Sequence, residues 1–234
     1  MVDRLIRHAS RLTRQAALGR LGWLRGAIGG TLGIGFAGAV TFLLLHGHDD
    51  RLPLLVAPLG ASAVLVFALP ASPLAQPWAV IGGDLISAAI GLLVGHVVGV
   101  PMAAASLAVG LAIAAMTLAR CLHPPGGACA LLCALGATSQ LTWGLAHWLA
   151  IAVNVGALVV AGWIVNTLTG HPWPHRAVEP PVTAGGELVR TRAALAAVIA
   201  EWDEIVDVDV DDLAVLFEAV RARRDGRGAG AGSR

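Results

Sequence analysis

Charged side chains are scarce in this chain of 234 residues. They make up 13 % of it, whereas soluble domains carry about a quarter. Lysine is absent, so all 16 basic residues are arginine. Between Leu52 and His175 only Asp84 and Arg120 carry a formal charge. Because hydrophobic residues reach 56 %, the composition excludes an ordinary soluble protein and predicts an integral membrane protein.

Cysteine and catalytic motifs are also in short supply. The three cysteines, Cys121, Cys129 and Cys133, lie inside the apolar region, which favours reduced packing residues over a disulfide framework. The chain contains no nucleophile elbow, phosphate loop, dinucleotide fingerprint or zinc-protease helix. We therefore expect neither enzyme activity nor a cofactor. The net charge of +1 averages a basic amino end and an acidic tail, so it gives no support to nucleic acid binding.

Residues 1–25 form a basic segment with a single acid, Asp3. Its apolar residues recur at helical spacing, which predicts an amphipathic helix on the anionic inner leaflet and a cytoplasmic amino terminus in the bacterial inner membrane. A cleaved organelle transit peptide has the same composition and stays open. The arginines of this segment are Arg4, Arg7, Arg11, Arg14, Arg20 and Arg25.

The apolar middle of the chain, residues 26–170, predicts an all-α polytopic membrane domain. Four stretches are long enough to cross a bilayer core of about 30 Å at roughly 1.5 Å per residue. Two shorter stretches, Leu54–Leu69 and Gly126–Ala137, are led by proline and glycine and resemble half-helices or re-entrant segments. The four predicted full spans are Gly26–Leu45, Ala79–Val100, Met102–Ala119 and Trp143–Leu168.

The two short stretches share the pattern Pro-x-Gly-Ala-x-Ala-apolar-Leu, which begins at Pro58 and again at Pro125. This predicts a duplicated unit, with repeats at about residues 26–100 and 101–169. If the short helices cross, the halves are inverted, as in many secondary transporters. If they are re-entrant, four crossings remain, and both counts keep the two termini on the same side. The many glycine and alanine residues favour close helix packing.

The composition becomes polar after the prolines at 172–181. Residues 171–234 predict a soluble cytoplasmic tail with helices at Glu187–Glu204 and Asp211–Arg224 and a disordered end. About fifty residues are too few for a separate catalytic domain with a large core.

The most specific stretch runs from Arg120 to Ala128. Its prolines end one helix and begin the next, and we expect free helix-start amides there to bind an anion. Arg120 supplies charge and His123 can carry a proton. A tight turn with an arginine at the membrane surface is the alternative. The candidate binding residues are Arg120, His123, Pro124, Pro125, Gly126, Gly127 and Ala128, with Gly60, Ala61 and Ser62 from the paired short helix.

Asp84 is the only acid in the membrane region. It is a candidate proton carrier or partner of Arg120, with an acid at a helix start as the alternative. His96 and Asn154 are weaker candidates, since either residue can simply form an interhelical hydrogen bond. Residues His46, His48, Asp49 and Asp50 include metal-ligand types but lack closed-site spacing, so no metal site is expected.

His123-Pro124-Pro125, together with Gly126-Gly127-Ala128 and the Pro58-Leu-Gly-Ala-Ser-Ala segment, resembles the HPP family of bacterial and plastid membrane proteins. The resemblance covers residues from about 26 to 168. It implies a compact membrane domain of about four spans, and a plastid member is described as a nitrite transporter. Some relatives carry CBS domains after the membrane part, but this tail is too short for a pair.

These patterns favour a membrane transporter of a small inorganic anion, most concretely nitrite, whose uptake His123 could couple to a proton. Two alternatives stay open. One is a non-transporting scaffold or sensor that signals through the tail, and the other is a small-solute channel. The expected partners are the anion, the lipid bilayer and, if the protein is a homo-oligomer, further copies of the chain.

Overall fold

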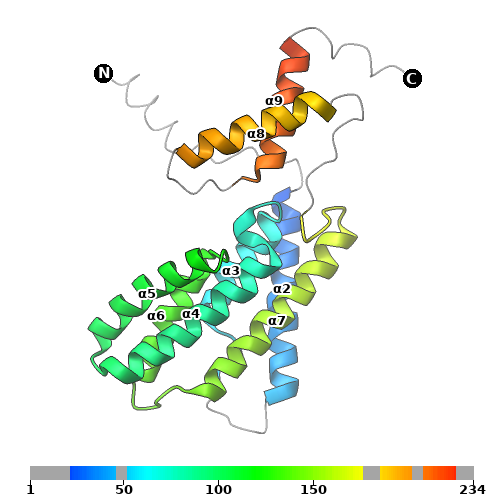
Figure 1. Cartoon of the computed structure of the whole chain (residues 1–234). Helices are drawn as coiled ribbons and strands as arrows, with labels where there is room; N and C mark the ends of the chain where they lie inside the picture. The colour runs from blue at the N-terminus through cyan, green and yellow to red at the C-terminus, as the bar shows by residue number, and fades with distance from the viewer. Residues whose placement is uncertain (1–21, 46–51, 176–184, 202–207, 225–234) are drawn as a thin grey trace, which may run out of the picture.

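The computed structural model describes residues 22–45, 52–175, 185–201 and 208–224. All regular elements in these ranges are helical, and the longer ones form a tilted bundle with two further helices at one end (Figure 1). The predicted amino-terminal segment up to residue 21 and the cluster at His46–Asp50 lie outside the described residues. The helices are α2 (Gly22–Leu45), α3 (Ala57–Ala68), η1 (Pro73–Ala75), α4 (Pro77–Val98), α5 (Pro101–Leu118), α6 (Pro124–Ala137), α7 (Leu145–Leu168), α8 (Gly185–Glu201) and α9 (Val210–Arg224).

The four predicted full spans are confirmed as α2, α4, α5 and α7, the helices that are long and apolar enough to cross a membrane. Both predicted short helices are confirmed as α3 and α6, with 12 and 14 residues. Proline at the first or second helical position begins α3, α4, α5 and α6, where its missing amide hydrogen is not needed. Between α4 and α5 the chain turns at Gly99, whose φ of 69° suits glycine.

Contacts between helix ends fix the direction of each helix. At one end of the bundle, Arg25 at the start of α2 contacts Asn166 near the end of α7, and Trp78 at the start of α4 contacts Ala119 after α5. At the other end, His96 of α4 bonds to Trp143, just before α7. Successive helices therefore alternate in direction, so α2–α3–α4 and α5–α6–α7 run in opposite senses. Opposite senses of this kind are a feature of inverted repeats.

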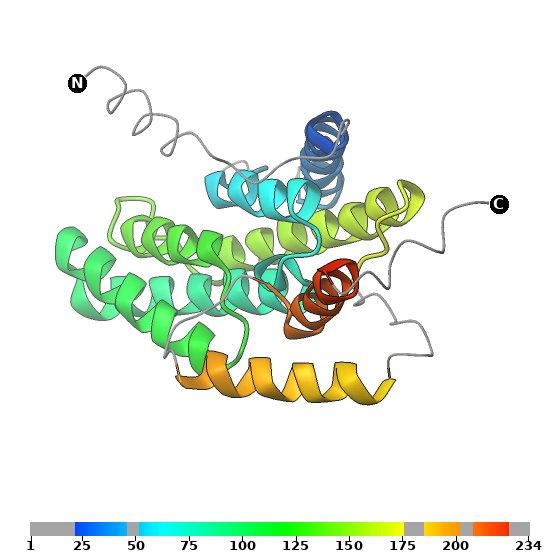
Figure 2. The same ribbon diagram turned by 90° about the horizontal axis from the view of Figure 1, so that it is seen from above.

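The duplication also appears in how the helices pack. Helix α2 contacts the short helix α3, and α5 contacts the short helix α6 in the same way. Helix α4 contacts α5, and α7 contacts α2. Seen from above, α2 and α5 lie on opposite sides of the bundle (Figure 2). Helix α4 is the central span, since 56 % of its most apolar window is buried compared with 22 % for α2. The outside is apolar, with Leu43, Val97 and Leu118 largely exposed, as expected for a surface in contact with lipid.

Helices α4 and α6 form the closest contact in the bundle, and glycines make it possible. A Cβ atom at Gly91 of α4 would lie 2.4 Å from the carbonyl oxygen of Ala130 in α6. Another at Gly95 would lie 2.6 Å from the Cβ atom of Ala137. Backbone approach of this kind is how helices associate in lipid, where hydrophobic exclusion from water contributes little.

Replacing Gly91 with Ala should therefore destabilise the domain by about 1–3 kcal/mol, because α4 and α6 must move apart to admit the methyl group. The measurement is the thermal unfolding midpoint of the purified protein in detergent. Gly110→Ala in α5 is the matched control, since nothing lies within 4 Å of a Cβ atom there. Equal midpoints for Gly91→Ala and the unmodified protein would contradict the packing described.

The predicted helical tail is confirmed as α8 and α9, which pack on each other and lie at the end of the bundle where α2 begins (Figure 1). Arg192 of α8 forms an ion pair with Asp211 of α9. His175, which follows α7, bonds through Nε2 to Oδ2 of Asp212 at 2.8 Å, and its backbone amide donates to Gln76. The tail is thus connected to the loop that holds η1.

Candidate functional site

A buried polar cluster connects the two short helices to the central span. Asp84 of α4, Ser62 of α3 and His123 before α6 are all 0 % exposed. The hydroxyl oxygen of Ser62 lies 3.0 Å from Oδ2 of Asp84 and 2.9 Å from Nε2 of His123. The carboxylate and the imidazole are separated by 3.8 Å. Ser62 therefore bridges the only acid of the membrane region and the histidine of the His-Pro-Pro motif.

Equivalent positions of the duplicated motif contact the same carboxylate. Ser62 follows Pro58 by four residues, and Cys129 follows Pro125 by four. Ser62 bonds to one oxygen of Asp84, while the Cys129 thiol donates to the other at 3.4 Å. The two short helices thus converge on Asp84. Cys129 was expected only to fill space in the core, although its alignment with Ser62 was the signal that could have identified it.

Local backbone structure places His123. It is the residue before α6, in an extended conformation with φ of −141°, as expected for a residue that precedes proline. A Cβ atom at Gly83 would lie 2.4 Å from that of His123, so only glycine beside Asp84 lets the histidine approach α4. On its other side, Nδ1 of His123 lies 2.8 Å from the carbonyl oxygen of Leu74, the middle residue of η1.

This last contact assigns the histidine tautomer. A carbonyl oxygen can only accept, so Nδ1 carries a hydrogen and Nε2 is the nitrogen that gains or loses a proton. The Ser62 hydroxyl has one hydrogen, yet it contacts two potential acceptors, Nε2 and Oδ2. It can donate to only one of them. With Asp84 ionised and Nε2 of His123 unprotonated, one of the two contacts of Ser62 is not a hydrogen bond. Both are hydrogen bonds when a single additional proton is bound, either to Asp84 or to Nε2 of His123.

The two one-proton arrangements are related through Ser62. In the first, protonated Asp84 donates to the Ser62 oxygen and Ser62 donates to Nε2. In the second, Nε2–H donates to Ser62 and Ser62 donates to the carboxylate. Conversion moves one proton between Asp84 and His123, and both arrangements have zero net charge. Burial favours this neutral state over an isolated carboxylate, because an unpaired buried charge is costly.

The two helix starts offer fewer free amides than the predicted anion site requires, which corrects that prediction. Pro124 and Pro125 have no amide hydrogen, and the next amide, of Gly126, donates to the His123 carbonyl at 2.8 Å. In α3, Leu59 donates in the same way to Val56. In both helices proline removes a donor, and a backbone carbonyl three residues earlier accepts from the amide that follows it.

The other predicted site residues on the two short helices contribute no polar side chain to the cluster. Gly60, Ala61, Pro124 and Ala128 are exposed, Gly127 is half-buried, and Pro125 and Gly126 are buried.

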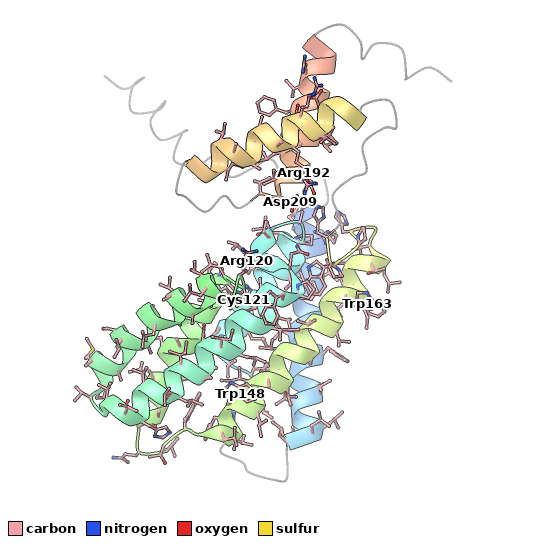
Figure 3. The ribbon with its side chains drawn as sticks, in the orientation of Figure 1. Arg120, Cys121, Trp148, Trp163, Arg192 and Asp209 are labelled. Carbon is pink, nitrogen blue, oxygen red and sulfur yellow. The ribbon has the colours of Figure 1, made fainter. Side chains whose placement is uncertain are left out.

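Arg120 is exposed, with a φ of 53°, and Figure 3 shows it near the end of the bundle that faces the tail. The expected Asp84–Arg120 pair is wrong: within the described part of the chain, the hydrogen-bonding partners of Asp84 are Ser62 and Cys129, with His123 nearby.

The two weaker candidates form interhelical bonds. His96 is exposed and bonds through Nε2 to the carbonyl oxygen of Trp143 at 2.8 Å. The Asn154 amide donates to Thr41 of α2 and to the carbonyl of Leu54. These are the structural roles considered as alternatives for both residues. Neither residue joins the Asp84 cluster.

One further buried hydroxyl lies beside the cluster. Ser87 of α4 follows Asp84 by three residues and so shares its helix face. It is 0 % exposed, and its oxygen has no hydrogen-bond partner among the described residues. That oxygen would lie 2.9 Å from a Cβ atom at Gly126. A buried hydroxyl without a partner is uncommon and calls for an explanation.

These features define a polytopic α-helical membrane protein with a buried acid–hydroxyl–imidazole cluster at its centre. Residues 15–174 match the family described as HPP, transmembrane region. The chain therefore belongs to the HPP transmembrane family.

Curated relatives include two transmembrane proteins of Dictyostelium discoideum, each 35 % identical over 140 residues. The aligned part covers 57 % and 56 % of this chain, and 48 % and 44 % of the relatives. The chain thus spans about half the length of these relatives. No solved structure matches it.

Proposed function

We propose that this protein is a membrane transporter that moves a small inorganic anion, nitrite, together with a proton. The observation that carries the proposal is the Asp84–Ser62–His123 cluster, because ionisable groups buried in a membrane domain usually mark an ion or proton pathway. The family is consistent with a membrane transporter. A proton-binding group between two inverted units is also where alternating access places a coupling site.

Charge balance links the proton to an anion. When the neutral cluster takes up a second proton, Asp84 and Nε2 of His123 both become donors, and Ser62 accepts from both. The Ser62 hydroxyl can then donate to the Pro58 carbonyl, which lies 3.4 Å away. The cluster now carries +1, and a buried unpaired charge is unfavourable. An accompanying anion restores neutrality, so one proton and one anion cross with no net charge.

Ser87 is the residue we propose to contact the anion. Its hydroxyl is buried without a partner among the described residues and lies on the same helix face as Asp84. A Cβ atom at Gly126 would lie 2.7 Å from the Gly83 carbonyl oxygen and 2.9 Å from the Ser87 hydroxyl, so the α4–α6 contact is closed at this point. We propose that α4 and α6 separate when the anion enters.

The Ser62–His123 contact also has the distance expected of an activated nucleophile. Its surroundings favour proton transfer instead of an enzymatic reaction, because the carboxylate bonds to the serine, while Nδ1 of the histidine donates to a backbone carbonyl. The proline-led start of α6 also lacks free amides for an oxyanion. We therefore propose a transport role without chemical conversion of the anion.

Nitrite entry into proteoliposomes that contain the full-length protein tests the proposal. Nitrite would be assayed inside the vesicles, with protein-free vesicles measuring passive entry. We expect saturable uptake that an inward proton gradient accelerates and that an imposed membrane potential leaves unchanged. Uptake no faster than in protein-free vesicles would contradict transport. Unsaturable flux would indicate a channel, and dependence on potential without dependence on pH would contradict proton coupling.

A specific set of contacts favours a sensor as the second candidate. Asp212 of α9 holds His175, and the His175 amide holds Gln76. The loop carrying Gln76 includes the Leu74 carbonyl that bonds to His123. A change in the tail can therefore reach the buried cluster. A sensor predicts no nitrite flux and loss of signalling when the tail after Pro181 is deleted, whereas a transporter retains flux.

A further inference from the structure

An apolar groove runs between α2 and α7 on the outside of the bundle. Its volume is about 410 Å³, within the range of small-molecule sites. Leu24, Ile28 and Leu32 line it from α2 at intervals of four residues, and Val165 and Leu168 line it from α7. Residues at this spacing form a row along one side of a helix. The groove shares no lining residue with the Asp84 cluster and belongs to the face that contacts lipid.

A single charged residue, Arg25, lies at one end of this groove. One guanidinium nitrogen, Nη1, donates to Oδ1 of Asn166 at 2.9 Å. Asn166 is 0 % exposed and is itself held by the carbonyl of Val66. The Nε atom of Arg25 is buried and has no partner among the described residues. The side chain is therefore fixed in position while part of its hydrogen-bonding capacity is unused.

Arg25 also has no acidic partner among the described residues. The described part of the chain holds ion pairs at His175–Asp212, Arg192–Asp211 and the buried cluster, and none involves Arg25. Asn166 contributes a neutral amide. Nη2 of Arg25 forms no hydrogen bond with the described residues, and the terminal donors of a guanidinium match the oxygen atoms of a phosphate group. The groove thus combines a cation that has no acidic partner among the described residues with a long apolar surface.

The position of Arg25 indicates the boundary between lipid and water. Trp23, two residues earlier, is 61 % exposed, and exposed tryptophan is typical of that boundary. From Arg25 to Leu32 the helix advances about 10 Å toward the bilayer centre. A molecule with a phosphate at Arg25 would therefore extend its apolar part along Ile28 and Leu32. This is the arrangement of a phospholipid in the leaflet on the side of the tail.

We propose that this groove binds one anionic phospholipid, with its phosphate on Arg25 and an acyl chain along Leu24, Ile28 and Leu32. Anionic lipid is favoured over zwitterionic lipid because Arg25 has no acidic partner among the described residues, so a headgroup of net negative charge neutralises it. This site is separate from the transport cluster, and the proposal does not depend on the substrate.

Native mass spectrometry of the full-length protein tests the proposal. The protein would be titrated in detergent with phosphatidylglycerol or phosphatidylcholine of identical acyl chains. We expect one retained phosphatidylglycerol per chain and a preference of about tenfold over phosphatidylcholine. Arg25→Gln should remove this preference. Ile28→Trp should fill the groove and reduce retention of both lipids. Arg120→Gln, which changes an exposed arginine outside the groove, should leave the preference intact.

Several outcomes would overturn this assignment. One is equal retention of the two lipids by the unmodified protein, and another is an unchanged preference in Arg25→Gln. A dimer that is lost in Ile28→Trp would instead assign the groove to a second copy of the chain. Circular dichroism of each variant shows whether it is folded. If Arg25→Gln fails to fold, Ile28→Trp decides alone, because unchanged lipid retention in that variant would exclude a lipid from the groove.

Discussion

Replacing His123 with Gln should abolish proton-driven nitrite uptake, with a loss of about 100-fold or more in initial rate. Glutamine cannot take up a proton, so the cluster cannot reach the +1 state that pairs with an anion. The measurement is the initial uptake rate in proteoliposomes under an inward proton gradient. His96→Gln is the matched control, because His96 is exposed and bonds to a backbone carbonyl. Uptake by His123→Gln at the rate of His96→Gln would exclude the histidine from the mechanism.

Asp84 should respond differently from His123 if the cluster alternates between neutral and +1. The side-chain amide that Asp84→Asn introduces would donate to Ser62 as a protonated Asp84 does. The cluster of this variant is therefore neutral, and it reaches the +1 state when Nε2 of His123 takes up a proton. We expect uptake by Asp84→Asn within about threefold of the unmodified protein, a change below about 1 kcal/mol. Complete loss of uptake in a folded Asp84→Asn variant would show that Asp84 must ionise, which contradicts the charge balance proposed above.

Removing the Ser62 hydroxyl should have the second large effect. In the +1 state, Asp84 and Nε2 of His123 both carry a hydrogen, and Ser62 is the acceptor between them. In Ser62→Ala the two donors would face each other 3.8 Å apart. Each unsatisfied buried donor costs about 1–3 kcal/mol. We therefore expect uptake to fall about 100-fold, a loss of roughly 3 kcal/mol in barrier height.

Ser106→Ala is the control for Ser62→Ala. Ser106 is exposed on α5, and its hydroxyl donates to the carbonyl four residues earlier, a local bond that Ser62 also forms with Pro58. The control thus removes the same local bond without touching the cluster. Thermal midpoints of both variants separate loss of transport from loss of folding. If Ser62→Ala retains full uptake, the bridge between Asp84 and His123 is dispensable.

The prolines at the start of α6 led to one correct prediction, that a helix begins there, and to one wrong prediction, that its first amides bind an anion. Proline suits the start of a helix because its missing amide hydrogen has no partner there. The same property removes the donors that an anion at a helix start requires. In α6 two prolines occupy these positions, and the Gly126 amide bonds to His123. His-Pro-Pro therefore serves to place the histidine side chain in the protein interior.

Membrane residence, the four long helices to within about four residues of their observed ends, the two short helices and the helical tail were determined by the sequence alone. Each follows from local composition: long uncharged runs, prolines at helix starts and a motif repeated after 67 residues, from Pro58 to Pro125. The separate importance of Asp84, His123 and Ser62 could also be predicted, because polar groups are rare in such a region.

Only the tertiary structure decided that these three residues meet, that Cys129 joins them and that Arg120 does not. The bonded partners lie 22 to 61 residues apart in the chain. No local sequence pattern specifies which residues so far apart in the chain will be in contact. They meet because α3, α4 and α6 pack together, and α4 approaches α6 closely where Gly83, Gly91 and Gly95 of α4 leave room for His123, Ala130 and Ala137. Packing between helices is a property of two surfaces together, so neither surface alone predicts it.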